Sequence, residues 1–373
     1  MGSGFVEQAL PSWRRAVLKV GSSLLAADEG GLSPRYAAAL AAFVERSRAN
    51  GRDVVIVSSG AVAAGRALAT PGQAMGLPAR QALAALGQTR LIALWQGFFD
   101  APVAQVLLTH DDLRHRRRYL NARSTLRELL ALRAIPVINE NDTVAVDELK
   151  LGDNDNLAAI VAALVDADIL LIATDIGGLY SANPRIAPDA APIDDVAAVT
   201  PELYAIAGGS GSRSGTGGMR TKLEAAEKAA AAGIETILFD GTDATVVGRL
   251  ADGMLSGTRI RAPRTRLAAR KYWLRHAPSA GSITIDPGAA RAVRERGASL
   301  LPGGVLGATG DFARGDVVEI ACEEDGLPVG RGISQYAAVD IRRIARKHTR
   351  DIDAVLGYSY GENVIHRDDL VAL

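Results

Sequence analysis

The sequence has very little cysteine and no long hydrophobic run. Cys322 is the single cysteine among 373 residues, so no disulfide can form within the chain and a reducing, cytoplasmic compartment is expected. It lies in the apolar run 317–322, which is typical of a strand, and we expect a buried structural thiol. The longest apolar runs, such as 157–165, are far shorter than the ~18 residues that cross a bilayer. We therefore expect no membrane span.

The sequence also lacks an excess of either charge. Its 42 basic and 42 acidic residues cancel, which excludes a whole-chain attraction to nucleic acid or to an anionic membrane. The five histidines show no metal-ligand spacing, and a single cysteine excludes a thiolate zinc site. No metal site is assigned to the side chains.

Two familiar phosphate-binding motifs are missing: no Gly-Lys pair exists for a Walker A loop, and no segment fits G-x-G-x-x-G. Residues 215–222, GTGGMRTK, nevertheless place three glycines, two hydroxyls and Lys222 before an alanine-rich segment that reads as a helix. Glycines let backbone N–H groups approach an anion, and a helix N-terminus and a lysine add positive charge. This loop predicts a phosphate cradle on a less common nucleotide-binding fold.

From about residue 15 to 238, short β-branched runs alternate with longer segments rich in alanine and leucine. This alternation is typical of β-α-β units, and runs that are apolar on both faces suit strands covered by helices above and below. We predict a three-layer α/β/α sandwich with a mainly parallel sheet. The expected strands are 16–20, 53–57, 103–108, 135–138, 169–174 and 236–239.

Polar groups gather just after four of these strands, in segments 19–23, 58–60, 139–142 and 174–175. Ligands of open α/β sheets bind outside the carboxyl ends of the strands, so these segments point to one edge. A serine-capped turn or a helix N-cap could explain the first two segments. Caps do not explain the many Asp and Asn side chains of 139–142 and 153–156, whose spacing is not that of a calcium loop. We predict a pocket that binds an ammonium group and orients lysines.

The composition changes near residue 257. Between 257 and 280 there are seven basic residues and no acidic one, and beyond 280 short alternating runs are separated by glycine-rich turns, with one helix near 289–296. We predict a loose tail over residues 1–12, a catalytic domain over 13–257, a basic connector over 258–280 and a small β-rich domain over 281–373.

Taken together, LKVGSS, VSSGAVAAGR, INEND, GDNDN, TDIGGLY and GTGGMRTK resemble the motif series of the glutamate 5-kinases, within the amino acid kinase family. The segment GSITIDPGAARAVRERGASLLPGGV resembles a PUA domain, and the likeness runs from about residue 15 to 373. The resemblance implies phosphorylation of the side-chain carboxylate of L-glutamate to L-glutamyl 5-phosphate with ATP and Mg²⁺, the first step toward proline. It also implies inhibition by proline, a homo-oligomer and a functional link to glutamyl phosphate reductase.

The resemblance also assigns roles to residues. Lys19 and Lys222 would contact the transferring phosphoryl group, and Asp155 would orient both lysines. The glutamate-binding residues would be Ser59, Asn139, Asp142, Asp153 and Asn154. The ATP-binding residues would be Lys19, Gly21, Ser22, Thr174, Asp175, Thr216, Gly217, Gly218, Met219, Arg220, Thr221 and Lys222.

Two alternatives stay open. One is another small carboxylate or carbamate kinase of the same fold. The other is an RNA-binding protein that acts through the PUA-like domain and the basic cluster within 342–350. The neutral net charge and the lack of obvious stacking aromatics weigh against RNA as a partner.

Overall fold

The computed structural model describes residues 4–27, 31–68, 76–145, 154–207, 218–265, 269, 271, 274–275, 277–324 and 326–373. The chain forms two compact units. The first contains residues 1–115 and 121–266, and the second contains residues 116–120 and 267–373. Each unit has its own sheet and its own hydrophobic core.

The first unit is built on an eight-stranded sheet in the order β4-β5-β3-β2-β6-β10-β12-β9. The pairs from β4 to β10 are parallel, β12 runs antiparallel to β10, and β9 is parallel to β12. All six expected strands and the mainly parallel sheet are thereby confirmed. In this order the strands are β4 (Val103–Leu108), β5 (Ile135–Glu140), β3 (Asp53–Ser58), β2 (Arg15–Val20), β6 (Ile169–Thr174), β10 (Glu235–Asp240), β12 (Gly257–Ile260) and β9 (Asp195–Val196).

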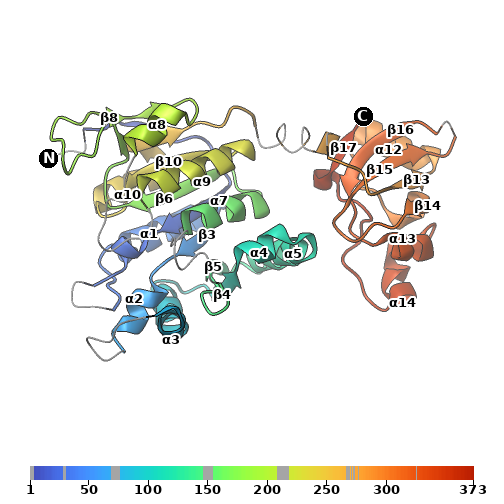
Figure 1. The fold of residues 1–373 in the computed structure, drawn as a ribbon. Coiled ribbons are helices and arrows are strands. Elements are labelled where there is room, and N and C mark those ends of the chain that lie inside the picture. Colours follow the sequence, from blue (N-terminus) through green and yellow to red (C-terminus); the bar gives the residue numbers. More distant parts are fainter. Residues whose placement is uncertain are drawn as a thin grey trace. The chain divides into compact units, whose positions relative to one another are not determined.

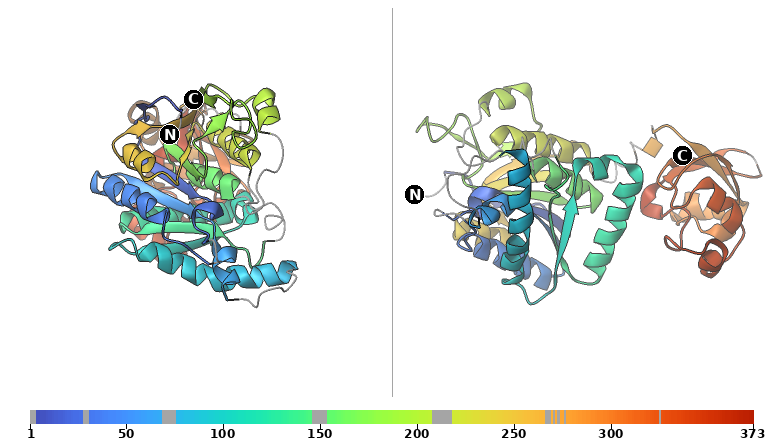
Figure 2. Two further views of the ribbon diagram at one scale, coloured as in Figure 1. Left: turned by 90° about the vertical axis from the view of Figure 1, so that its left-hand side faces the viewer. Right: turned by 60° about the horizontal axis from the view of Figure 1, so that its bottom comes forward.

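Helices cover both faces of this sheet, which confirms the α/β/α sandwich (Figures 1 and 2). Their bounds are α1 (Ala37–Ala49), α2 (Ala61–Arg66), α3 (Leu77–Gln96), α4 (His110–Arg114), α5 (Arg116–Ala131), α7 (Asn154–Leu164), α8 (Pro201–Ile206), α9 (Met219–Ala231) and α10 (Ala244–Ala251). Two small two-stranded sheets flank the main one: β1 (Gln8–Ala9) pairs with β11 (Met254–Leu255), and β7 (Leu179–Tyr180) pairs with β8 (Pro192–Ile193).

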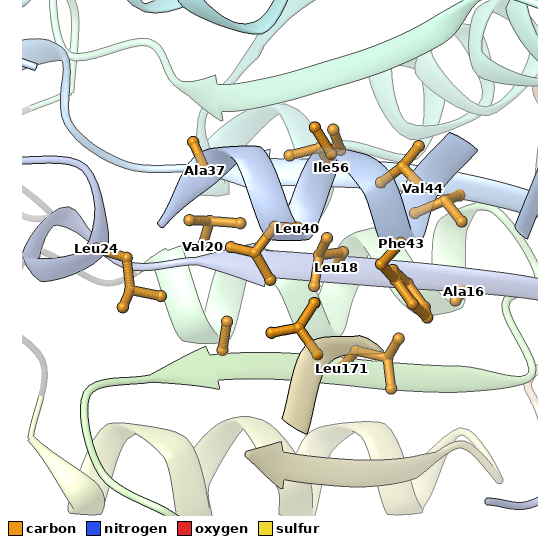
Figure 3. Packing of buried hydrophobic residues seen from close by; sticks show 14 of the residues in the cluster. Ala16, Leu18, Val20, Leu24, Ala37, Leu40, Phe43, Val44, Ile56 and Leu171 are labelled. Atoms are coloured by element: carbon orange, nitrogen blue, oxygen red, sulfur yellow. The ribbon is translucent and has the colours of Figure 1, made fainter. Parts of the chain in front are cut away.

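The alternation of side chains along β2 determines which face of the sheet Lys19 points to. Ala16, Leu18 and Val20 belong to the core that β2 forms with α1, where Leu40 of α1 packs (Figure 3). Because successive side chains of a strand point to opposite faces, Lys19 faces the other side of the sheet. There it meets the first turn of α7.

The N-terminal segment and the 258–280 segment differ from the sequence-based expectation. Residues 1–12 are not loose throughout, because Phe5 and Leu10 are buried and β1 pairs with β11. Residues 257–260 form β12 of the main sheet, so the first unit continues to residue 266 rather than ending at 257. Both departures come from pairing between segments distant in sequence, which local composition does not reveal.

The second unit holds a five-stranded sheet in the order β14-β13-β15-β16-β17, which confirms the small β-rich domain. Cys322 lies buried on β15 in the core of this unit, as expected. The partly exposed rings of Tyr358 and Tyr360 lie 5.1 Å apart and are tilted at 56° to each other. The elements are β13 (Gly281–Ile285), α12 (Pro287–Arg296), β14 (Val305–Gly310), β15 (Val317–Cys322), β16 (Pro328–Ile333), α13 (Ala338–Ile344), α14 (Ile352–Leu356) and β17 (Leu370–Ala372).

Within the described residues of both units, none of the helices combines the length and the apolar character that crossing a bilayer requires.

Candidate active site

One buried carboxylate joins the two lysines that the sequence singled out. Lys19 Nζ lies 2.6 Å from Asp155 Oδ1, and Lys222 Nζ lies 3.1 Å from Asp155 Oδ2. Only 1% of the Asp155 surface is exposed, and both lysines are buried as well. The expected contact between Asp155 and both lysines is therefore present, at the carboxyl end of β2.

Two helix starts bring this cluster together. Asp155 stands in the first turn of α7, and Lys222 stands in the first turn of α9, whose N-cap is Gly218. Thr221 Oγ1 donates to Asp155 Oδ2 at 2.8 Å and also lies 2.9 Å from the Gly218 carbonyl oxygen. The N-terminus of α9 is thus tied to the α7 carboxylate through the hydroxyl and the lysine of the sequence Met-Arg-Thr-Lys.

The charge balance of the cluster favours an anion. Burial acts to raise the pKa of Asp155, but the charges of Lys19 and Lys222 outweigh it and hold that pKa well below its ordinary value. The carboxylate is therefore ionised at neutral pH. Two ammonium groups against one carboxylate leave a net positive charge in a buried place, beside the positive end of α9.

A glycine keeps the space beside the first lysine free of a side chain. A Cβ on Gly21 would lie 3.5 Å from Lys19 Nζ. Ser22 follows it and opens a 3-10 turn over Ser22–Leu24. The Gly-Ser segment after β2 therefore leaves room near the ammonium group for a ligand.

A chain of side-chain hydrogen bonds lies next to this cluster. Asn154 Nδ2 donates to Ser59 Oγ at 2.8 Å and to Asn139 Oδ1 at 3.0 Å, and Asn139 Nδ2 donates to Gln88 Oε1 at 2.9 Å. Two buried atoms of this chain, Gln88 Nε2 and Asn154 Oδ1, have no hydrogen-bond partner among the residues that the structure describes. A free donor and a free acceptor suit a ligand that carries both a carboxylate and an ammonium group.

Gln88 was missed by the sequence analysis. It lies on α3, whose buried positions are 83, 84, 87, 88, 91 and 95. These positions have helical spacing, and Gln88 is their only polar side chain. A glutamine on the otherwise apolar stripe of a helix is a signal that could have identified it.

Asp142 follows β5, beyond Glu140 at its last position. Burial of the Asp142 carboxyl, with the added negative charge of Glu140, raises its pKa to about 7 against the opposing charge of Arg80. A carboxyl that is partly protonated at neutral pH becomes fully ionised only when a cation arrives. Asp142 is therefore suited to an ammonium group.

A further pair of predicted residues ends β6. Thr174 is buried at the last position of the strand, and Asp175 follows it. Burial acts to raise the pKa of Asp175, but its ion pair with Arg185, at 2.7 Å, and the charge of Lys222 lower it. The Asp175 carboxylate is thus close enough to Lys222 for that charge to lower its pKa.

Other predicted residues lie outside the described part of the chain or contact groups other than the cluster. Asp153, Thr216 and Gly217 lie outside the described residues. Met219 opens α9, whereas the exposed Arg220 side chain pairs with Glu224 at 3.1 Å and lies over the Tyr204 ring. The Arg220 guanidinium thus contacts the helix surface rather than Asp155.

The site has the donors that a nucleotide needs. Lys19, Lys222 and the N-terminus of α9 offer positive charge and N–H groups to phosphate oxygens. Among the described side chains, no group of three or more His, Cys, Asp or Glu could hold a metal ion, and Asp155 is engaged by two lysines. These residues fit ATP with a Mg²⁺ ion carried on the phosphates.

Comparison with known proteins agrees with this chemistry. The model of the amino acid kinase family matches residues 14–240, and that of the PUA domain matches residues 281–356. A glutamate 5-kinase of Xanthomonas oryzae pv. oryzae is 71% identical, covering 96% of this chain and all of the relative. A glutamate 5-kinase of Xylella fastidiosa is 66% identical, and the match covers 100% of this chain and 98% of the relative.

A solved UMP kinase of Bacillus anthracis covers 68% of this chain and 98% of its own, at 14% identity and a TM-score of 0.47, which is too distant a likeness to add to the assignment. The family assignment rests on the family match and on the relatives. The chain belongs to the amino acid kinase family, in its glutamate 5-kinase branch, and carries a PUA domain after the kinase domain.

Proposed function

We propose that this kinase transfers the γ-phosphoryl group of ATP to the side-chain carboxylate of L-glutamate and forms L-glutamyl 5-phosphate, in the first step toward proline. The observation that carries the proposal is the buried Lys19–Asp155–Lys222 cluster beside the amide chain of Ser59, Asn154, Asn139 and Gln88. The names of the relatives, all glutamate 5-kinases, support the choice of substrate.

The reaction needs no general base. The nucleophile is a carboxylate with an ordinary pKa near 4.3, so it is already ionised at neutral pH. A bond forms between a carboxylate oxygen and the γ-phosphorus, the bond from that phosphorus to the β,γ-bridging oxygen breaks, and ADP leaves with the electron pair. No proton has to move during this exchange.

The main obstacle is repulsion between an anionic nucleophile and an anionic phosphate. Lys19 and Lys222 supply the cations that reduce it, and they are held before the substrates arrive because both pair with Asp155. Asp155 is a positioning residue in this proposal. The N-terminus of α9, from Gly218 to Thr221, provides backbone donors for the phosphates, and Thr174 and Asp175 border the nucleotide.

The amide chain and Asp142 define the amino acid end of the pocket. Asp142 is the partner for the substrate ammonium group, since an acidic amino acid still carries one cation. Gln88 Nε2 would donate to an oxygen of the substrate and Asn154 Oδ1 would accept from a substrate N–H group, so both buried atoms would gain a partner. Mg²⁺ would enter on the ATP phosphates and neutralise part of their charge.

The regulation and assembly of the enzyme follow from the family resemblance alone. We infer feedback inhibition by proline, a homo-oligomer, a cytoplasmic location and a functional link to glutamyl phosphate reductase, which would consume the acyl phosphate. Proline inhibition is testable by titrating proline at fixed glutamate, and the oligomer by light scattering of the full chain.

Trapping of the product tests the substrate directly. The protein is incubated with Mg-ATP, hydroxylamine and one candidate acid at a time, and an acyl phosphate is captured as a coloured hydroxamate. Formation with glutamate and not with aspartate, N-acetylglutamate or carbamate is expected. Hydroxamate from another acid alone would assign the chain to a different carboxylate kinase.

A further inference from the structure

Residues Phe5–Leu10, which we call the N-terminal strap, are fixed to the first unit at several points. Val6 N donates to Asp194 Oδ1 at 2.8 Å, and Leu10 N donates to the Gly253 carbonyl at 2.8 Å. Between them, Glu7 forms a two-contact ion pair with Arg249, at 2.6 and 2.7 Å. The strap includes the strand β1, so its course over the unit is defined by backbone pairing as well as by side chains.

The strap ends on the turn that follows Asp175. Phe5 is only 9% exposed, although it lies near the start of the chain. A Cβ on Gly177 would lie 2.6 Å from Phe5 Cε2, and a Cβ on Gly178 would lie 2.9 Å from Phe5 Cζ. The ring therefore rests directly on the backbone of both glycines, and it packs edge-on against Tyr180 at 5.1 Å.

The same turn is held from β12. Thr258 Oγ1 accepts from Leu179 N at 2.8 Å, and it would lie 2.6 Å from a Cβ on Gly178. Phe5 and Thr258 together leave the two glycines little freedom to move. The turn follows Asp175 in the sequence, and Arg185, which lies beyond the turn, forms an ion pair with the Asp175 carboxylate. The turn 177–180 therefore lies between Asp175 and the arginine that pairs with it.

We propose that the N-terminal strap positions the turn 177–180, and through it Asp175, for nucleotide binding. This inference rests on the proposed function, because it takes Asp175 to border ATP. Phe5 touches no substrate in this account and is a positioning residue. Its loss should therefore weaken the ATP side of the site and leave the amino acid side, which is built on α3, β5 and α7, unchanged.

Steady-state kinetics of the full-length chain tests the proposal. For Phe5→Ala we expect the KM for ATP to rise by about fivefold, with kcat and the KM for glutamate within about twofold of wild type. Phe5→Leu, which keeps an apolar side chain of similar reach, should restore most of the affinity. Val6→Ala is the matched control, because Val6 is the next residue and is 66% exposed.

A double-mutant cycle sharpens the assignment. Gly177→Ala alone puts a methyl group against the Phe5 ring, so it should also raise the KM for ATP. Phe5→Ala removes the nearest atoms that this methyl group would strike, Phe5 Cε2 and Cδ2, and leaves only the Tyr180 hydroxyl at 3.0 Å. The double variant should therefore be less impaired than the product of the two single effects. Independent effects would contradict a contact between the two positions.

Other outcomes overturn the proposal. An unchanged KM for ATP in Phe5→Ala, or equal rises in both KM values with a lowered Tm, would mean that the strap only stabilises the fold. The affinity of Phe5→Ala for a non-hydrolysable ATP analogue, measured without glutamate, tests the same point independently of turnover. An affinity equal to that of the wild type would overturn the proposal. Failure of the proposed function is distinguishable, since the wild-type protein would then form no glutamate hydroxamate.

Discussion

The carboxylate of Asp155 lies 2.6 Å from the ammonium group of Lys19, and both groups are almost completely buried. Asp155 stands at the start of α7 and Lys19 near the end of β2, so the pair fixes a helix terminus against the carboxyl end of a strand. The other carboxylate oxygen of Asp155, Oδ2, pairs with Lys222 of α9. The cationic site is therefore assembled in the absence of substrate, which spares the reaction the cost of ordering two flexible lysines.

Removal of the second lysine should affect turnover far more than folding. We expect Lys222→Ala to lower kcat by roughly 10²–10³, because one preorganised positive charge is lost where negative charge gathers. The Tm should change little, since Lys19 still pairs with Asp155. Arg220→Ala, on the same helix but paired with Glu224, is the control and should retain most activity. Equal losses in the two variants would refute the assignment.

Loss of the carboxylate should destabilise the protein. Asp155→Asn keeps the shape but leaves two buried lysines without their counter-charge, and we expect a cost of about 3 kcal/mol in the free energy of unfolding, together with a lower kcat. Asp252→Asn breaks an exposed ion pair with Arg46 and should cost less than about 1 kcal/mol. Urea denaturation compares the two. A similar loss in the free energy of unfolding in both variants would show that the buried Asp155 contributes no more to stability than an exposed ion pair.

The affinity for glutamate should depend on pH through Asp142. The pKa of this carboxyl is raised to about 7, so its ionised fraction grows as the pH rises from 6 to 8. Only the ionised form attracts the substrate ammonium group, and the KM for glutamate should therefore fall about tenfold over that range. Asp142→Asn should have a high KM without this slope. A wild-type KM for glutamate that is flat between pH 6 and 8 would exclude the role.

Substitution of Gln88 should raise the KM for glutamate but not the KM for ATP. Gln88→Leu leaves Asn139 Nδ2 without its acceptor and removes the free Nε2 donor, and an unpaired buried donor costs about 1–3 kcal/mol. We expect the KM for glutamate to rise by about tenfold, with the KM for ATP unchanged. Thr89→Ala, at the next and exposed position of α3, is the control. A shift in both KM values would indicate a general disturbance of the fold instead.

Much of the kinase unit could be predicted from its sequence. Runs such as 169–174 are apolar on both faces and are followed by polar side chains, and this local pattern identifies strands of a covered parallel sheet and the edge where ligands bind. Lys19, Asn139 and Thr174 were found in this way, because each follows or ends such a run. The RNA alternative was weighed on composition, which did not show that Tyr358 and Tyr360 lie together on the surface.

Other features depend on contacts between distant segments. Gln88 is one of seven glutamines in the sequence, and it becomes part of the site only because the fold places α3 so that Gln88 contacts Asn139 of β5. The end of the kinase unit was misplaced for the same reason: β12 joins the sheet by pairing antiparallel with β10, although its sequence resembles a basic connector.

The sequence by itself determined the strands and the parallel sheet, because hydrophobic periodicity is a local property of a chain. Tertiary structure alone decided that Gln88 would complete the amide chain and that Phe5 would rest on Gly177 and Gly178. It also placed Asp155 against both lysines, a contact that the family resemblance had implied. Those outcomes depend on which faces of separate elements meet, and packing of the whole core sets that arrangement.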